Sequence, residues 1–357
     1  MLKKIKESLR YKIRRVYYKY IKSLSKKELS ERFSKLDFNK KYLVLHNPNW
    51  LGITSATKST FSNTLAVEEL YSKKQIYYIA EYIIANKYST VIFSGMVDGW
   101  PSLIKELKKQ NKNIKIKIVW HGSNALISEK EDYLIFKKVL ELYKEKLVDQ
   151  LVFVKKSMYE FYKAKGYNTY FLMNNVSLDK NKEHKGKKNN SNVKVGLYSS
   201  GNRWVKNTYV QICAISLIKN VDLDCVAYDN KIYEFSKLHG LKLKGSSHHI
   251  PREELFKRMS VNDVNVYATF TECAPMLPLE SFELGVPCVT SNNHHYFKGT
   301  ELEKLTVVSE IDNIMAIKEK IDNCLKNKEK IMKLYKEWKI EYDIEVKNNI
   351  EEFLKQV

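Results

Sequence analysis

Short apolar runs alternate with longer amphipathic stretches through the first half of the chain. Helical patterns of roughly 10 to 20 residues separate runs of strand length at residues 42–46, 91–93, 114–120, 151–154 and 170–173. A loop is expected at residues 47–54, followed by a helix to about Tyr71. This alternation predicts right-handed βαβ units and a parallel sheet, which binds ligands beyond the carboxyl ends of its strands.

A second series of the same kind begins at Val193. Its helices include Tyr209–Ile218 and Arg252–Met259, and the chain is helical from about Ile311, with Trp338 and Phe353 as anchors. Its strands are predicted at residues 193–199, 222–227, 241–244, 264–270, 286–290 and 305–308. Residues 177–192 hold almost no apolar side chain and predict a linker. The fold class is therefore α/β, with two Rossmann-like domains at residues 31–176 and 193–335.

The first 30 residues form a separate basic segment, with eleven Lys or Arg against two Glu. Steps of three and four residues place its apolar side chains along one side of a helix: Leu2, Ile5, Leu9, Ile13, Val16, Tyr20 and Leu24. A basic amphipathic helix with aromatic residues is typical of a segment that lies on an anionic membrane surface. The alternative is a helix that packs on the first domain and turns its basic face to solvent.

Composition changes the picture only in part. The chain has 357 residues, 44% of them hydrophobic, and no apolar run long enough to cross a membrane. Its start lacks the apolar core of a secretion signal. Five cysteines without a Cys-x-x-Cys pair indicate reduced thiols in a cytosolic protein, with no disulfide framework or zinc site. The net charge of +21 suggests nucleic-acid binding as another hypothesis, but the sequence has no motif of a nucleic-acid-binding protein.

The most informative segment is residues 270–290, where two carboxylates, Glu272 and Glu280, lie eight residues apart. An apolar strand precedes Glu272, Glu280 sits in a short helix that stops at Gly285, and Gly-Val-Pro leads into another buried strand. The segment resembles the Glu-x7-Glu signature of retaining GT-B glycosyltransferases of the group 1 type, which use nucleotide-sugar donors. That family has two Rossmann-like domains with the ligand in the cleft between them, and its last helix, here residues 336–357, crosses back to the first domain.

The resemblance implies roles for both carboxylates. Glu272 would contact hydroxyls of the donor sugar, and Glu280 would accept hydrogen bonds from the ribose diol. The loop between them would offer backbone N–H groups to the sugar and the β-phosphate near a helix N-terminus. Pro275 and Pro278 cannot donate, so the contributing residues of this loop are Cys273, Ala274, Met276 and Leu277.

Further site residues follow from the same resemblance. Arg203 and Lys206, in a Gly- and Ser-containing loop after the strand at 193–199, are similar to the family's Arg and Lys that neutralise the donor diphosphate. His249 and Ile250, before the helix led by Pro251, would flank the nucleotide base.

In the first domain, His121 in Trp-His-Gly-Ser resembles the family's strand-end His-Gly, whose imidazole meets a sugar hydroxyl or the acceptor. Gly52 matches the Gly-containing first loop, where the backbone approaches phosphate or acceptor closely. Asp98 follows another strand and could reach the acceptor.

Several patterns have simpler readings. Cys273 is interpreted as a small apolar filler and not as a nucleophile, and Glu283 as a helix-surface residue. The sequence Asp222-Leu-Asp224 matches a metal–diphosphate motif of another glycosyltransferase fold, but it starts a strand in mid-domain, which favours chance. No third ligand follows the dihistidine at 248–249, so no metal site is expected.

Together these features predict a retaining, metal-independent hexosyltransferase that moves sugar from a UDP- or GDP-sugar to a lipid-linked or cell-surface glycan. Catalysis would fall to Glu272, His121 and Lys206. The expected partners are the donor, the glycan acceptor and an anionic membrane surface bound through residues 1–24. The expected place is the inner face of the cell membrane. The alternative is a catalytically silent GT-B subunit that binds nucleotide or supports a partner enzyme.

Overall fold

The computed structural model describes residues 26–176, 178, 192–199 and 202–356. The chain forms two compact units, one of residues 1–174 with 349–357 and the other of residues 175–348. The basic helix predicted at residues 1–24 and nearly all of the linker predicted at 177–192 lie outside the described residues.

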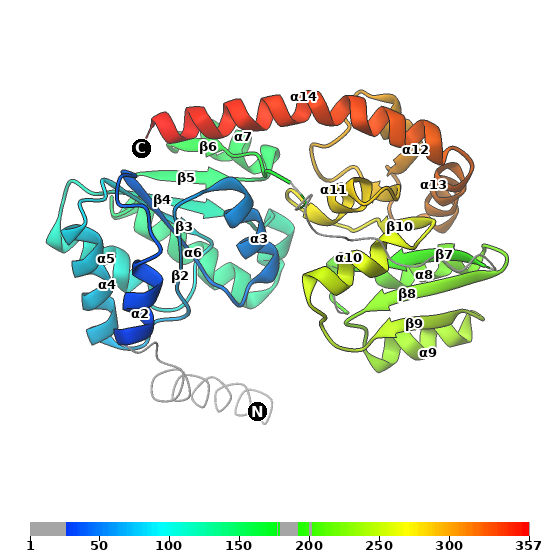
Figure 1. Ribbon diagram of the computed structural model, residues 1–357, viewed down its shortest axis with the longest axis horizontal. Helices are drawn as coiled ribbons and strands as arrows, with labels where there is room; N and C mark the ends of the chain where they lie inside the picture. The colour runs from blue at the N-terminus through cyan, green and yellow to red at the C-terminus, as the bar shows by residue number, and fades with distance from the viewer. Residues whose placement is uncertain (1–25, 177, 179–191, 200–201, 357) are drawn as a thin grey trace. The chain divides into compact units, whose positions relative to one another are not determined.

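The first unit is built on a parallel sheet with the strand order β2-β1-β3-β4-β5-β6 (Figure 1). Its strands are β1 (Tyr42–His46), β2 (Thr64–Ala66), β3 (Thr90–Ser94), β4 (Lys115–Trp120), β5 (Gln150–Phe153) and β6 (Thr169–Phe171). Most strand positions are buried, as expected of a parallel sheet covered on both faces by helices. The strands predicted from the apolar runs are confirmed, with β2 added.

Helices connect these strands in the order that the amphipathic stretches predict. They are α2 (Lys26–Phe33), α3 (Leu51–Thr60), α4 (Lys73–Ala85), α5 (Trp100–Gln110), the 3-10 turn η1 (Asn124–Ser128), α6 (Lys130–Lys144) and α7 (Lys156–Ala164). One stretch was predicted wrongly. The helix begins at Leu51, inside the predicted loop, and ends at Thr60, because Thr64–Ala66 pairs with Val44–His46 as a strand too short to produce a periodic signal.

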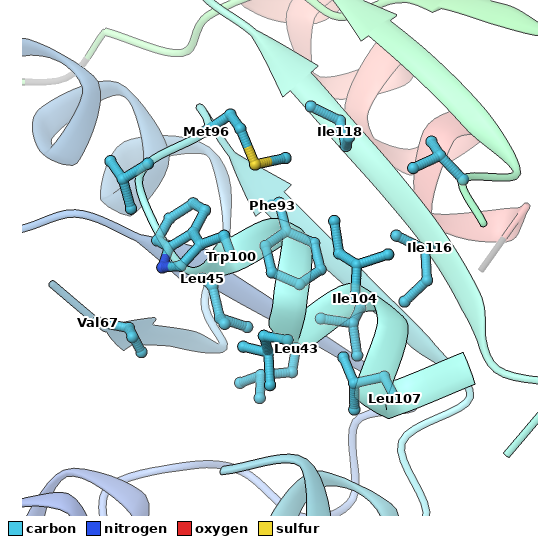
Figure 2. Packing of buried hydrophobic residues seen from close by; sticks show 14 of the residues in the cluster. Leu43, Leu45, Val67, Phe93, Met96, Trp100, Ile104, Leu107, Ile116 and Ile118 are labelled. Atoms are coloured by element: carbon cyan, nitrogen blue, oxygen red, sulfur yellow. The ribbon is translucent and has the colours of Figure 1, made fainter. Parts of the chain in front are cut away.

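The core of the first unit is packed between the sheet and its helices (Figure 2). Trp100, Ile104 and Leu107 of α5 are fully buried, at the spacing that gives a helix one apolar face. The ring of Trp100 meets that of Phe93 edge-on at 5.4 Å between centroids. Gly99 precedes α5 at φ +87, where a Cβ would lie 1.9 Å from the carbonyl oxygen of Leu70, so this close turn requires glycine.

The second unit has its own parallel sheet, with the order β12-β11-β10-β7-β8-β9 (Figure 1). Its strands are β7 (Val193–Leu197), β8 (Val221–Val226), β9 (Lys242–Ser246), β10 (Val264–Tyr267), β11 (Cys288–Ser291) and β12 (Val307–Val308). All of them were predicted. The strand expected at 264–270 ends earlier, at Tyr267, so that residues 268–275 form the loop that carries Glu272.

The helices of the second unit also follow the predicted pattern. They are η2 (Trp204–Lys206), α8 (Thr208–Ser216), α9 (Asn230–Leu238), α10 (Arg252–Ser260), α11 (Met276–Glu283), α12 (Glu301–Thr306), α13 (Ile314–Lys326) and α14 (Lys328–Lys355). Gly285, at φ +82, ends the α11 segment as expected of a helix C-terminus. The last residues of α14 belong to the first unit, where Asn349 donates to the carbonyl of Phe171 at 2.9 Å and Phe353 is fully buried.

Candidate functional site

Each sheet has one place where its connections change direction. In the second sheet, β7 lies between β8 and β10, so the chain first builds toward one edge and then returns to build toward the other. A parallel sheet opens a ligand site outside the carboxyl ends of the two strands at such a switch point. The segment after β7 carries Lys206, β10 ends at Tyr267, and Glu272 follows five residues later.

These three side chains form one hydrogen-bonded cluster. The Nζ of Lys206 lies 2.6 Å from Oε1 of Glu272 and 2.9 Å from the hydroxyl of Tyr267. The Tyr267 hydroxyl donates to the same Glu272 oxygen at 2.8 Å. The structure therefore brings together two residues that the sequence singled out, and adds Tyr267, which the sequence analysis missed. Its signal was its position as the last residue of a buried strand, five residues before Glu272.

The electrostatics of this cluster fix the charge of Lys206. Burial disfavours the ammonium ion, but Tyr267 and Glu272 outweigh burial and raise the pKa of Lys206 above its ordinary value. Burial first, and then the negative charge of Glu272, raise the pKa of the Tyr267 hydroxyl. Lys206 is therefore a permanent cation and Tyr267 a neutral hydroxyl at any physiological pH, with Tyr267 accepting from Lys206 and donating to Glu272.

Glu280, the second carboxylate of the motif, is buried in α11 with 6% of its surface exposed. Its Oε1 accepts from Nη2 of Arg252 at 2.5 Å. Burial raises the pKa of Glu280, and Arg252 opposes that shift. Arg252, the first residue of α10, is a second side chain that the sequence analysis did not assign to the site.

The backbone between the carboxylates can donate to an anion. Cys273 and Ala274 are buried in the loop, and α11 begins at Met276 after Pro275. The first N–H groups of a helix have no partner within the helix, which leaves those of Met276 and Leu277 for other acceptors. The burial of Cys273 agrees with its interpretation as an apolar filler.

Arg203, His249 and Ile250, which were also predicted for donor binding, lie in the same unit. Arg203 precedes η2, and its carbonyl accepts from the backbone N–H of Lys206 at 2.9 Å. His249 is exposed in the segment between β9 and α10. Ile250 packs on a small apolar cluster that includes Tyr198 and Phe256. Their roles in donor binding stay predictions.

The first sheet has a corresponding switch point, because β1 lies between β2 and β3. Ser94 ends β3, and its Oγ lies 2.9 Å from Nε2 of His121, which directly follows β4. The same Oγ lies 2.6 Å from the hydroxyl of Thr57 in α3. Burial lowers the pKa of His121 to about 4, so its imidazole is neutral at physiological pH.

Gly52 was predicted in a loop, and this was wrong. It lies in the first turn of α3, where the backbone is helical and a Cβ would meet no atom within 4 Å. No close contact of this residue requires glycine. Asp98 lies just before α5, and its carbonyl accepts from the N–H of Leu70 at 2.9 Å.

Both aspartates of the Asp-x-Asp pattern are paired with other side chains. Asp222 pairs with Lys244 at 2.5 Å, and Asp224 accepts from Tyr198 at 2.6 Å and pairs with Arg258 at 3.1 Å. Among the described residues, no group of three or more His, Cys, Asp or Glu side chains is placed to hold a metal ion.

A search of the described helices also finds none both long and apolar enough to span a membrane.

Glu283 lies at the surface of α11, as interpreted from the sequence, and it also contacts α14. Its Oε1 accepts from the hydroxyl of Tyr335 at 2.8 Å and lies 3.9 Å from Nζ of Lys339. Both partners come from α14. Glu283 therefore joins α11 to α14, which explains a carboxylate one turn after Glu280 by packing.

Comparison with known proteins gives a family match over part of the chain. Residues 179–340 match the family described as glycosyl transferases group 1, which confirms the resemblance to the group 1 type and leaves the motif and the retaining mechanism as predictions. The comparison with curated proteins found no match.

Solved structures with the GT-B fold resemble most of the chain. A structure of HepE from Anabaena in complex with UDP-glucose has a TM-score of 0.64 at 10% identity, and the match covers 88% of this chain and 99% of that one. An Escherichia coli trehalose-6-phosphate structure bound to UDP-2-fluoro glucose has a TM-score of 0.60 at 10% identity, covering 88% and 97%. The lipopolysaccharide outer core galactosyltransferase WaaB has a TM-score of 0.54 at 13% identity, covering 83% and 94%. At these identities the likeness establishes the fold.

Proposed function

We propose that this chain, a GT-B protein that matches the glycosyl transferases group 1 family over residues 179–340, is a retaining glycosyltransferase that uses a nucleotide-sugar donor. The observation that carries the proposal is the cluster of Lys206, Tyr267 and Glu272 at the switch point of the second sheet. A fixed cation and a carboxylate meet there beside the loop whose N–H groups precede and open α11. These groups suit an anionic diphosphate joined to a sugar rich in hydroxyls.

Each member of the cluster has a task in this reaction. Lys206, held charged by its neighbours, stabilises the diphosphate as negative charge develops on it. Glu272 accepts hydrogen bonds from hydroxyls of the donor sugar. Tyr267 keeps a hydrogen-bond partner on Glu272 when Lys206 turns toward the phosphate, so that the carboxylate is never left unpaired in a half-buried position.

Glu280 fits the ribose of the same donor. A carboxylate accepts two hydrogen bonds from a vicinal diol, and Glu280 lies eight residues after Glu272 at the far end of the same loop and helix segment. Only one of its oxygens has a described side-chain partner, Arg252. Arg203, His249 and Ile250 remain candidates for the diphosphate and the base.

The chemistry proposed is transfer with retention. The bond from the anomeric carbon to the diphosphate breaks, a bond to an acceptor hydroxyl forms on the same face, and the departing diphosphate takes the acceptor proton. Lys206 and the loop N–H groups would supply the charge stabilisation that a metal supplies in other glycosyltransferases. Neutral His121 in the first unit would donate to or accept from a sugar or acceptor hydroxyl.

The acceptor proposed is a lipid-linked or cell-surface glycan. It is supported by the basic, amphipathic sequence of residues 1–24, which suits an anionic membrane surface. Full-length protein should sediment with anionic vesicles, and added salt should release it, because screening limits such charges to about 10 Å at 0.1 M. Binding that is absent at low salt would remove this part of the proposal.

Hydrolysis of nucleotide sugars without acceptor tests the proposed activity. Purified full-length protein is incubated with UDP-, GDP- and ADP-sugars, and the nucleoside diphosphate released is measured. UDP-glucose is the first donor to try, because HepE, with a similar fold, has been solved with it. Slow release from one donor would name that donor. Tight nucleotide binding with no release or transfer would instead favour a catalytically silent subunit.

A further inference from the structure

Arg252 and Glu280 form a pair whose two members lie in different surroundings. The side chain of Glu280 is 8% exposed and that of Arg252 44% exposed, and Nη2 of Arg252 lies 2.5 Å from Oε1 of Glu280. The guanidinium also lies over the ring of Phe256, 4.9 Å from its centroid, in the next turn of α10. The arginine therefore reaches inward from the surface with its head group held in a defined place.

Other charged and titratable groups also lie near α11. Glu283 is bonded to Tyr335 and lies near Lys339 of α14, and Cys288 of β11 is a buried thiol whose pKa is raised by burial. On α10 and β10, which also pack against α11, the other such groups are Glu253, Glu254, Lys257 and Arg258 of α10 and Tyr267 of β10. Among the described residues, Arg252 is the cation in contact with Glu280.

We infer that Arg252 is a positioning residue for the donor nucleotide, which it serves by keeping the carboxylate of Glu280 charged and correctly turned to accept hydrogen bonds from the ribose diol. The inference rests on the proposed function, because it assumes that Glu280 is the ribose ligand. Nothing in the Glu-x7-Glu spacing calls for an arginine at position 252, which comes from another helix.

The physical reason is the cost of a buried carboxylate. Burial favours the neutral acid, and Arg252 is the named group that opposes this. Without its cation, Glu280 would take up a proton at a higher pH than in the native protein. A protonated carboxyl has an O–H donor in place of one acceptor, so it no longer matches two ribose hydroxyls.

Nucleotide affinity measured against pH tests this role. UDP and GDP are titrated by calorimetry into the full-length wild-type protein and into Arg252→Met and Arg252→Lys, from about pH 5.5 to 8.5, and the tighter nucleotide is followed. The ratio of variant to wild-type Kd removes the titration of the nucleotide's own terminal phosphate, whose pKa lies near 6. For Arg252→Met this ratio should grow as pH falls, approaching about tenfold per pH unit once Glu280 protonates. Arg252→Lys should keep the ratio nearly flat.

Arg258→Met is the matched control, because Arg258 lies on the same helix and pairs with another part-buried carboxylate, Asp224, at 3.1 Å. Its loss should lower thermal stability but leave the pH dependence of nucleotide binding as in the wild type. In Arg252→Met, Tm should fall further below that of the wild type at pH 8.5 than at pH 5.5. At pH 8.5 Glu280 is left as an unpaired buried charge, whereas at pH 5.5 it can take up a proton and become neutral. This second measurement needs no nucleotide.

The outcomes separate the two claims. A Kd ratio that is the same at every pH in Arg252→Met would overturn the positioning role, even if affinity falls. If Arg252→Met does not fold, Arg252→Lys decides the question. The inference then requires that Arg252→Lys bind the nucleotide as the wild type does across the pH range. Failure of the wild-type protein to bind either nucleotide would overturn the proposed function and the inference with it.

Discussion

The two units place similar elements at the same edge of similar sheets, yet the groups found there differ in charge. In the second unit the switch point holds the cation Lys206 against Glu272, and a second ion pair, Arg252 with Glu280, lies in the adjoining helices. In the first unit the carboxyl ends of β1, β3 and β4 hold hydroxyls and neutral imidazoles, and the charged pair of Arg32 and Glu68 lies beside β2. Ser94 and Thr57 share a hydrogen bond, and His121 contacts Ser94.

The histidines at these strand ends are neutral because they are buried. His46 ends β1 and is 1% exposed, and its Nδ1 lies 3.1 Å from the hydroxyl of Thr54. Burial, helped by nearby Lys58 and Arg32, lowers the pKa of His46 to about 4, the same value that burial alone gives His121. Both rings are therefore uncharged at neutral pH.

The difference shows how one fold can be divided between two tasks. A charged edge suits a diphosphate, whose negative charge must be matched, whereas an edge of neutral hydrogen-bonding groups suits hydroxyls, which carry no charge. The topology sets where a ligand can bind, and the side chains at the strand ends set which ligand it is. The division of labour that we propose, with the donor on the second unit, follows from this contrast.

Loss of the charged cluster should have the largest effect. Lys206→Met and Glu272→Ala should each lower the rate of transfer by at least about 100-fold, corresponding to about 3 kcal/mol of transition-state stabilisation. Lys244→Met is the matched control, because it removes a lysine of the same sheet that is paired with a different carboxylate, Asp222. Its rate of transfer should stay within a few-fold of that of the wild type. Near-normal turnover in both site variants would remove the enzyme assignment from this cluster.

A smaller effect is expected from Tyr267→Phe, which keeps the ring and deletes the hydroxyl shared by Lys206 and Glu272. One lost hydrogen bond to charged groups is worth about 1.5 kcal/mol, or roughly tenfold in kcat. Circular dichroism and Tm should show a folded protein. Unchanged kcat and donor KM would mean that Lys206 and Glu272 are held well enough without Tyr267.

The neutral histidines of the first unit should appear in the pH dependence of stability. Their pKa values are lowered from 6.5 to about 4 in the folded state, so their contribution is complete above pH 6.5 and is lost as pH falls from 6.5 toward 4. Tm should fall across this window, and His121→Asn should flatten the fall. The same profile in wild type and variant would show that His121 titrates normally in the folded protein.

The smallest effect is expected from metal removal. Among the described residues no group of three or more His, Cys, Asp or Glu side chains is placed to hold a metal ion, and Lys206 with the loop N–H groups is proposed to balance the diphosphate charge. Activity should survive EDTA. Complete loss with EDTA and recovery with Mn²⁺ or Mg²⁺ would direct attention to Asp222 and Asp224, which are paired with Lys244 and Arg258 in this structure.

Much of the fold was readable from the sequence, because buried parallel strands and amphipathic helices leave strong patterns. The prediction failed at residues 51–66, where a three-residue strand is defined by its pairing with β1 and not by periodicity. At the site, the Glu-x7-Glu spacing brought out Glu272 and Glu280. Tyr267 and Arg252 were missed, since their importance depends on which side chains they meet across the fold.

Nucleotide binding by paired variants of the two units tests the central claim most directly. UDP is titrated calorimetrically into full-length wild-type protein, Lys206→Met and His121→Asn, with GDP used in the same way if it binds more tightly. Our account predicts that Lys206→Met weakens binding by at least about tenfold, from the loss of a charge-assisted contact, whereas His121→Asn binds as wild type does. Normal affinity in Lys206→Met together with lost affinity in His121→Asn would contradict it and move the donor site to the first unit.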